Sequence, residues 1–352
     1  MIREVRLFLL LTRPAVLLLL VLFAAIGATR SGAATHAVTL AQIYFIVAAF
    51  LVFSVAANDL ADIAIDRVNL PGDRSRPLAA GTARQRDMVL LLACCATACL
   101  AVAATVNAAV LLTTACGLAI SAAYSLPPSR LASRGAVASM ILPACYVATP
   151  FLIGFYAGRP TLSGADAVLL AGLYIGFIGR ILLKDFRDVR GDALFGKRTF
   201  LVRHGRRATC LLSAATWTAG TALVVSAGPL DASAVTYAAQ ALAVLILVAM
   251  LSRDRGPRRD EIIIATTAIL GRGLLLTVVA QSQLAAAQWS TSATWAWMLA
   301  LAAVTAGQAW SMYRHGPRLR LLAMPMTLQA AEMPAAVDAE RPGPCRAREV
   351  TR

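Results

Sequence analysis

Long apolar stretches separated by short polar loops follow one another along most of the 352-residue chain. Each stretch has about 20 residues, the length that an α-helix needs to cross a hydrocarbon core of roughly 30 Å. The stretches are continuous rather than alternating, so they predict helices and not the strands of a membrane barrel. Ten spans are predicted, at residues 14–30, 41–58, 88–106, 108–126, 136–157, 165–183, 208–228, 233–251, 262–283 and 293–312. The pattern indicates an all-α polytopic membrane protein.

The composition agrees with this fold class. Hydrophobic residues make up 59% of the chain and charged residues only 14%, whereas soluble proteins carry about 25% charged residues. The beginning of the chain has the basic start, apolar core and small residues of a secretory signal peptide. We interpret it as a retained first span, because the rest of the chain is also predicted to lie in the membrane.

The formal net charge of +15 comes from 33 Lys and Arg residues against 18 Asp and Glu residues. The basic residues concentrate before the first span and in the loops after the even-numbered spans, with Arg30 and Arg159 as exceptions. Basic residues in short loops set the topology of a membrane protein, so this excess does not indicate nucleic-acid binding. The N-terminus and these loops, including residues 58–87 and 184–207, are predicted to be cytoplasmic, in a protein of the inner (plasma) membrane surrounded by lipid.

The apolar pattern ends near residue 316, and the remaining residues are rich in Pro, Arg and Glu. Such a composition does not supply enough apolar surface to form a core. We therefore expect a transmembrane domain over residues 1–316 and a disordered cytoplasmic tail over residues 317–352.

Two acidic segments occupy equivalent places in this topology. Residues 58–66 read NDLADIAID and end the second span, and residues 184–192 read KDFRDVRGD and end the sixth. In each segment three aspartates are spaced i, i+3, i+7. Together with Asn58, those of the first segment project within an arc of about 100° on one face of a helix. One such triplet fits an ordinary solvated helix end, but two on the same side of the membrane indicate a shared site.

The residue types in these segments indicate a particular chemistry. Like charges at this spacing repel, so a cation is expected to offset them. The segments contain no His or Cys, and oxygen ligands alone favour Mg²⁺, which typically uses one or two carboxylates plus substrate phosphates. Arg74 and Arg76 follow the first segment, and Lys197 and Arg198 follow the second. Carboxylates mixed with cationic side chains suit a bound diphosphate.

These motifs resemble those of the UbiA superfamily of intramembrane prenyltransferases, over about residues 10–285. The matching segments are Asn58-Asp59-x-x-Asp62-x-x-x-Asp66 with Arg76-Pro77-Leu78 and Gly81, Lys184-Asp185-x-x-Asp188-x-x-x-Asp192 with Gly196-x-Arg198-Thr199, YSLPPSRLASRG at 124–135, and Thr12-Arg13-Pro14. The paired aspartate motifs are specific, whereas the Arg-Pro pair alone is weak. The loop around LPGDRSRPL is slightly longer than is usual in the family.

The resemblance implies a UbiA-type bundle of nine transmembrane helices around a central cavity, to which the hydrophobic pattern adds a tenth helix. It also implies Mg²⁺-dependent transfer of an isoprenyl group from an isoprenyl diphosphate to a small acceptor. By their positions in the motifs, the metal ligands would be Asn58, Asp62, Asp185 and Asp188. The catalytic acidic rim would be Asp59, Asp66 and Asp192. The diphosphate would be bound by Arg74, Arg76, Arg130, Lys184, Lys197 and Arg198.

Four further residues are predicted to line the substrate cavity: Arg13, Tyr124, Ser125 and Arg272. Arg272 lies about ten residues into the ninth span, where an arginine is costly and usually faces a cavity or a partner. Snorkelling and helix pairing are the alternatives for Arg272. For Tyr124 the alternative is an anchor at the membrane interface.

Three classes of protein fit these residues. The first is a prenyltransferase, for which an aromatic or quinone-precursor acceptor is favoured. The second is an intramembrane terpene cyclase, which would use the same metal site to ionise a prenyl diphosphate and close the cation on its own tail. The third is a cation-coupled transporter, which would place its acids near the bilayer midplane. The third fits least well, because the acids are predicted at the cytoplasmic ends of spans.

Overall fold

The computed structural model describes residues 11–69, 76–194, 199–228, 232–253, 256–285 and 292–315, and in these ranges every regular element is helical. The α-helices are α2 (Pro14–Ser31), α3 (Ala37–Ala61), α4 (Ile63–Asn69), α5 (Gln85–Val106), α6 (Ala108–Ser125), α7 (Ala136–Pro143), α8 (Thr149–Tyr156), α9 (Gly164–Leu194), α10 (Phe200–Ser226), α11 (Ala232–Leu251), α12 (Pro257–Ala285) and α13 (Ser292–His315). Two short 3₁₀ turns, η1 (Ala33–Thr35) and η2 (Leu131–Ser133), and a π-helical segment, η3 (Ala144–Ala148), complete the elements. The prediction of an all-α polytopic protein is confirmed.

Nine helical segments of the described residues are long and apolar enough to cross a membrane. They correspond to the first nine predicted spans, and the fifth consists of α7, η3 and α8 in sequence. The predicted tenth span forms the helix α13, which has 24 residues but is not among these nine. The tail predicted over residues 317–352 lies outside the described residues.

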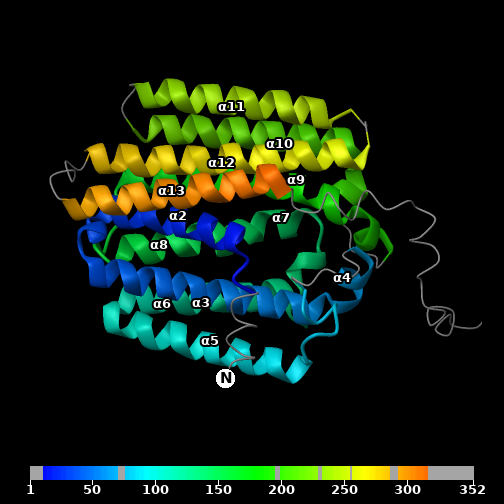
Figure 1. Cartoon of the computed structure of the whole chain (residues 1–352), viewed down its shortest axis with the longest axis horizontal. Helices are drawn as coiled ribbons and strands as arrows, with labels where there is room; N and C mark the ends of the chain where they lie inside the picture. Colours follow the sequence, from blue (N-terminus) through cyan, green and yellow to red (C-terminus); the bar gives the residue numbers. More distant parts are fainter. Residues whose placement is uncertain are drawn as a thin grey trace, which may run out of the picture.

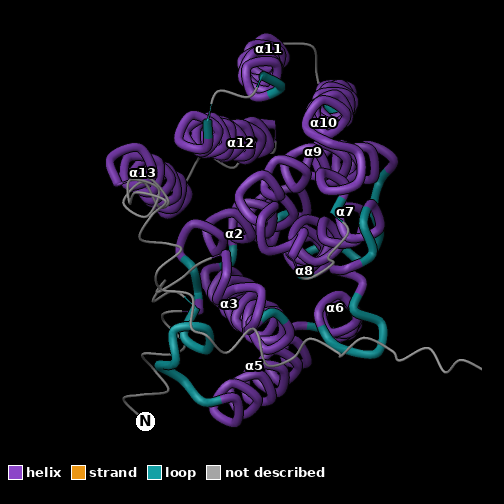
Figure 2. The backbone as a smooth tube through the Cα atoms, turned by 90° about the vertical axis from the view of Figure 1, so that its right-hand side faces the viewer, coloured by secondary structure: helices purple, strands orange, loops and turns teal. Residues whose placement is uncertain are grey.

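The helices run side by side along the length of the molecule (Figure 1). Viewed along them, α2 lies in the interior, and α5 and α11 lie at opposite edges (Figure 2). Helix α2 packs against α8, α12, α3 and α13, which explains why most of its residues are buried. This central position matters because Arg13, immediately before α2, lies at the candidate site.

Helices α2 and α8 cross in backbone contact at two glycines. A Cβ atom added to Gly154 would lie 2.1 Å from the carbonyl oxygen of Ala24, and one added to Gly27 would lie 2.0 Å from that of Phe151. Helices in membranes associate through such small residues, because lipid supplies little hydrophobic driving force between them. The two glycines therefore fix the distance of α2 from α8.

The first acidic segment is not the single straight helix that its spacing predicted. Helix α3 ends at Ala61, and Asp62 has φ −111° and ψ 20° before α4 begins at Ile63. Hydrogen bonds from Asp62 N to Asn58 O (3.0 Å) and from Asp66 N to Asp62 O (2.8 Å) continue across the break. The break places Asp59 on α3 and Asp66 on α4, so each aspartate is reached by a different set of neighbours.

The fifth span also departs from a regular α-helix. Between α7 and α8 the chain forms the π-helical segment η3, in which each turn is wider than a turn of the α-helices on either side. The hydroxyl of Thr149 donates to the carbonyl of Ala144 at 2.9 Å within this turn. Pro143 precedes the segment and has no N–H to give to a regular helix. The segment contacts α2, α6 and α9, so it lies in the interior of the bundle.

Candidate active site

The aspartates of the first acidic segment are paired with arginines from three different parts of the chain. Arg13 Nη2 lies 2.7 Å from Asp59 Oδ1, and Arg76 Nη1 contacts the same oxygen. Arg76 Nη1 also lies 3.1 Å from an oxygen of Asp66. These contacts bring together residues that are 46 and 17 positions apart. The end of α3, the start of α2 and the loop after α4 therefore form one charged cluster.

Arg130 holds the remaining aspartate of the segment. Its Nη2 donates to Asp62 Oδ1 and to the carbonyl of Ala61, both at 2.9 Å. Ala61 is the last residue of α3, so its carbonyl is one of the groups that a helix end leaves without an intrahelical partner. Arg130 thus gives the carbonyl at the end of α3 a hydrogen-bond partner and also neutralises the charge of Asp62.

Backbone strain concentrates on two of these arginines. Among the described residues, Arg13 (φ 40°) and Arg130 (φ 35°) are the two non-glycine residues with positive φ. A non-glycine residue in this region costs of order 1–3 kcal/mol and persists only where its surroundings require it. Each of the two precedes a helical element, α2 and η2 respectively. Both residues also form ion pairs of the cluster, Arg13 with Asp59 and Arg130 with Asp62.

The cluster is largely closed to solvent. Asp59 is 2% exposed, and its second oxygen, Oδ2, is buried with no hydrogen-bond partner among the described residues. Burial raises the pKa of Asp66 to about 6, against the lowering effect of Arg76 and with a further raising effect of Asp59. A carboxyl group with this pKa accepts a proton near neutral pH more readily than an ordinary aspartate.

The second acidic segment lies within α9, which continues beyond the span as far as Leu194. Helix α9 packs against α4, so the two acidic segments lie close together. Tyr124, on α6, lies within electrostatic range of both Asp185 and Asp62. Lys184 is exposed and Asp185 is half-buried. The side chains of Asp188 and Asp192, and the residues Arg74, Lys197 and Arg198, lie outside the described part.

The donors of the site fit a hard cation. In the described part of the chain, no three His, Cys, Asp or Glu side chains form a group that could hold a metal ion. The predicted ligands Asn58, Asp62 and Asp185 nevertheless offer only carboxylate and amide oxygens, the donors that Mg²⁺ prefers. Asn58 Nδ2 donates to Asp62 Oδ2 at 3.5 Å, which relates two of these donors directly. Asp59 Oδ2 is a further buried oxygen without a hydrogen-bond partner among the described residues, although Arg13 and Arg76 pair with the other oxygen of the same carboxylate.

The other predicted cavity residues lie around this cluster. Arg272 is 2% exposed and donates to the carbonyl of Ala268, in its own helix, at 2.9 Å and to that of Ala15 at 2.8 Å. It therefore links α12 to α2 two residues after Arg13, which agrees with the helix-pairing alternative. Ser125, the last residue of α6, is buried.

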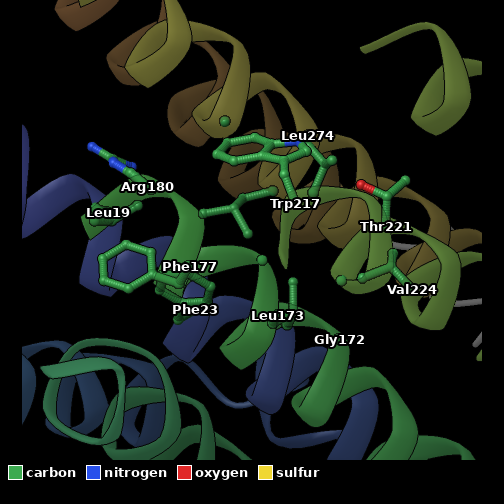
Figure 3. A pocket seen from close by; sticks show the side chains of 14 residues that line it. Leu19, Phe23, Gly172, Leu173, Phe177, Arg180, Trp217, Thr221, Val224 and Leu274 are labelled. Carbon is green, nitrogen blue, oxygen red and sulfur yellow. The ribbon is translucent and has the colours of Figure 1, made fainter. Parts of the chain in front are cut away.

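A small apolar pocket lies between α2, α9, α10 and α12 (Figure 3). Phe23, Phe177 and Trp217 contribute aromatic rings to its walls. Arg180 lines the pocket one helical turn before Lys184, with its guanidinium carbon 5.6 Å from the centroid of the Phe177 ring. Sequence reasoning did not single out this pocket or the nearby Tyr146, because their residue types are common in any apolar span.

The fold and the site define a class of protein: a helical membrane protein with an acidic and arginine-rich cluster at one end of its bundle and an apolar pocket within it. A profile of the UbiA prenyltransferase family matches residues 16–270. The chain therefore belongs to the UbiA prenyltransferase family, as its motifs predicted.

Named relatives and a solved structure support this membership. The chain is 28% identical to the bacteriochlorophyll synthase 34 kDa chain of Chloroflexus aurantiacus over 221 residues, 62% of this chain and 69% of that one. It is 29% identical to the homogentisate phytyltransferase of Synechocystis over 162 residues, 44% of this chain and 52% of that one. A UbiA homologue from Archaeoglobus fulgidus, solved bound to GPP and Mg²⁺, shares the fold with a TM-score of 0.58 at 17% identity, covering 79% of this chain and 99% of that one.

Proposed function

We propose that this protein transfers an isoprenyl group from an isoprenyl diphosphate to a small acceptor within the membrane, and that Mg²⁺ assists the transfer. The observation that carries the proposal is the cluster of Arg13, Arg76 and Arg130 on the aspartates of the first motif, beside the second motif and next to an apolar pocket. The cluster suits a charged diphosphate, and the pocket suits an apolar chain. Membership of the family and the diphosphate and Mg²⁺ bound by the Archaeoglobus fulgidus homologue support the same reading.

The arginines would bind and orient the diphosphate. Their guanidinium groups present several N–H donors in a fixed plane, which matches phosphate oxygens well. Arg13, Arg76 and Arg130 currently donate to aspartate oxygens, so a diphosphate would take over some of these donors. Bound Mg²⁺, held from Asn58, Asp62, Asp185 and Asp188, would neutralise further charge on the leaving group.

The reaction then requires little covalent participation by the protein. The bond between the allylic carbon and the diphosphate oxygen breaks, and its electron pair leaves with the oxygen. The acceptor supplies an electron pair to the carbon, and its proton passes to a carboxylate. Asp66 is the best described candidate for this base, because burial raises its pKa to about 6. Water must be excluded from the cation, and the surrounding buried aromatic and aliphatic side chains do this.

For the acceptor we propose an aromatic or quinone-precursor molecule. The related homogentisate phytyltransferase, by its name, acts on an aromatic compound, and the bacteriochlorophyll synthase chain belongs to the synthesis of a ring pigment. We further propose that the site faces the cytoplasm at the inner (plasma) membrane. The basic loops predicted to be cytoplasmic lie at the same end of the bundle as the acidic segments.

The decisive experiment incubates the purified full-length chain in lipid nanodiscs with Mg²⁺, prenyl diphosphates of several lengths and a panel of acceptors, and identifies products by mass spectrometry. A prenylated acceptor is expected, and both Asp62→Ala and Asp188→Ala should abolish it while the protein stays folded. Full activity in both variants would contradict the proposal. Product from a prenyl diphosphate without any acceptor would indicate the terpene cyclase instead.

A further inference from the structure

Tyr146 occupies an unusual place in the fifth span. It is the central residue of the π-helical segment η3, which separates the α-helices α7 and α8 of this span. Single π-helical turns inside membrane or soluble helices are rare and often occur at functional sites, because the extra residue redirects side chains. Cys145 and Val147 on either side of Tyr146 are buried, whereas Tyr146 keeps an accessible surface.

The surroundings of Tyr146 show that this surface faces the interior of the bundle. Its ring lies 6.4 Å from that of Phe177 on α9, tilted by 59°. Phe177 in turn lies edge-on to Phe23 of α2, with ring centroids 5.8 Å apart. The charged groups that act on Tyr146 include Arg13, Arg76 and Asp59, all members of the cluster described above. The segment that carries Tyr146 packs against α2, α6 and α9, and Tyr146 lies within electrostatic range of the cluster.

The position of Tyr146 relates the two halves of the proposed site. On one side are the arginines and Asp59, where a diphosphate would bind. On the other side are Phe177 and Phe23, which line the apolar pocket where a prenyl chain would lie (Figure 3). The carbon that joins the diphosphate to the chain must lie between these two places, and Tyr146 is close to both, since it senses the charges of the cluster and its ring lies 6.4 Å from that of Phe177.

An aromatic ring at this point has a specific use. The face of a tyrosine ring carries partial negative charge, and it attracts a cation most strongly where water is excluded. When the carbon–oxygen bond breaks and both electrons leave with the diphosphate, the allylic carbons carry the positive charge. The acceptor's electron pair then forms the new bond to this carbon, and the acceptor's proton passes to a carboxylate. The ring itself forms and breaks no bond.

We propose that Tyr146 is a catalytic residue of this protein, whose ring face stabilises the allylic cation while its hydroxyl is dispensable. The inference rests on the proposed function and deepens it. If Tyr146 had a purely structural role, activity would depend on the volume of its side chain and not on the electron density of its ring.

The kinetic test changes the electron density of the ring at position 146 while its shape stays nearly the same. Tyr146→Phe should keep kcat within about threefold of the original, and Tyr146→Leu should lower kcat by about 30-fold with little change in KM for the diphosphate. Phenylalanines with one, two and three fluorines at position 146 should lower log kcat in proportion to fluorination. Phe155, a buried ring on α8 stacked on Phe151, is the matched control, and its fluorination should change nothing.

A binding experiment separates this inference from the proposed function. Geranylammonium carries its positive charge on the nitrogen bonded to the carbon where the allylic cation would form, and it is titrated into the full-length protein with Mg²⁺ and inorganic diphosphate. Binding about 30-fold weaker to Tyr146→Leu than to Tyr146→Phe is expected. That result supports the cation site even if no prenyl diphosphate is turned over, in which case the proposed function alone fails. A flat fluorination series, or equal binding to the Leu and Phe variants, overturns the inference about Tyr146.

Discussion

Arg13 Nη2 lies 2.7 Å from Asp59 Oδ1, so the residue that precedes the first span is bonded to a carboxylate at the end of the second. Asp59 is 2% exposed, and a buried carboxylate is stable only when it is paired. A second pair of the same length joins the other end of the same helix to α9, between Arg30 Nε and Asp166 Oδ1. Helix α2 therefore carries two comparable ion pairs, only one of which lies at the candidate site.

The first prediction compares these two pairs. Arg30→Gln should destabilise the protein by up to about 3–5 kcal/mol, because it removes the ion-pair partner of the buried Asp166. Arg13→Gln should destabilise it less, because Asp59 keeps its ion pair with Arg76. Only Arg13→Gln should raise KM for the diphosphate, by about tenfold or more, because Arg30 lies at the opposite end of the bundle. Thermal unfolding and steady-state kinetics in the same nanodiscs measure the two effects. An equal rise of KM in both variants would mean that loss of stability, rather than loss of a ligand, controls binding.

The second prediction concerns Arg130 and Asp62. Arg130 places a positive charge 2.9 Å from an oxygen that we assign to the metal, so arginine and metal compete for it. Arg130→Ala should strengthen binding of Mn²⁺ in the absence of diphosphate by about tenfold, or about 1.4 kcal/mol, and should raise KM for the diphosphate. Arg134→Ala, an exposed arginine of the same loop, is the control and should change neither quantity. Weaker Mn²⁺ binding in Arg130→Ala would show that the arginine supports the metal site rather than competing with it.

The third prediction tests the crossing of α2 and α8. Gly154→Ala would place a Cβ atom 2.1 Å from the carbonyl of Ala24, so one backbone must move. Overpacking of this kind costs about 1–3 kcal/mol, and because α2 begins at the site, activity should fall as well. Gly307→Ala on α13 is the matched control, since an added Cβ would meet nothing within 4 Å there. It should be neutral or slightly stabilising, because alanine favours a helix over glycine. Equal unfolding temperatures for the two variants would contradict the close crossing.

Much of the fold could be predicted from the sequence, because the bilayer imposes a length and an apolar composition on every span. The predicted first span, residues 14–30, and the observed α2 differ by one residue at the end. The charge pattern also identified Arg30 as an exception, and its pairing with Asp166 gives that exception a physical reason. The two irregularities at Asp62 and η3 were not predictable, because the hydrophobic pattern continues unchanged through both.

The candidate site was predictable in composition but not in its contacts. Both acidic segments were visible because aspartates are conspicuous at the end of an apolar span. Which arginine meets which aspartate depends on how distant helices pack, as with Arg130 and Asp62, which are 68 positions apart. Arg272 shows the same limit: its depth in a span predicted a partner, but nothing in the sequence indicated the backbone carbonyl of Ala15.

The last prediction concerns how the second acidic segment is held. Arg206 makes a two-point ion pair with Asp260, Nη1 to Oδ1 at 3.1 Å and Nη2 to Oδ2 at 2.5 Å. The guanidinium carbon of Arg206 also lies 5.0 Å from the centroid of the Phe186 ring, and Phe186 directly follows Asp185. Arg206, on α10, therefore contacts the acidic part of α9 while it is paired with Asp260 of α12, and it does not belong to the arginine cluster on the first motif.

Two variants separate positioning by Arg206 from a simple contribution to stability. Arg206→Met alone leaves Asp260 buried without its partner and should destabilise the protein strongly, whereas Arg206→Met with Asp260→Leu removes both charges and should recover most of the stability. If the guanidinium positions Asp185 through Phe186, the double variant should still need about tenfold more Mg²⁺ for half-maximal activity, with kcat less affected. The measurements are thermal unfolding and Mg²⁺ titration of activity. If the Mg²⁺ requirement recovers together with stability, the ion pair only stabilises the fold and does not position the second motif.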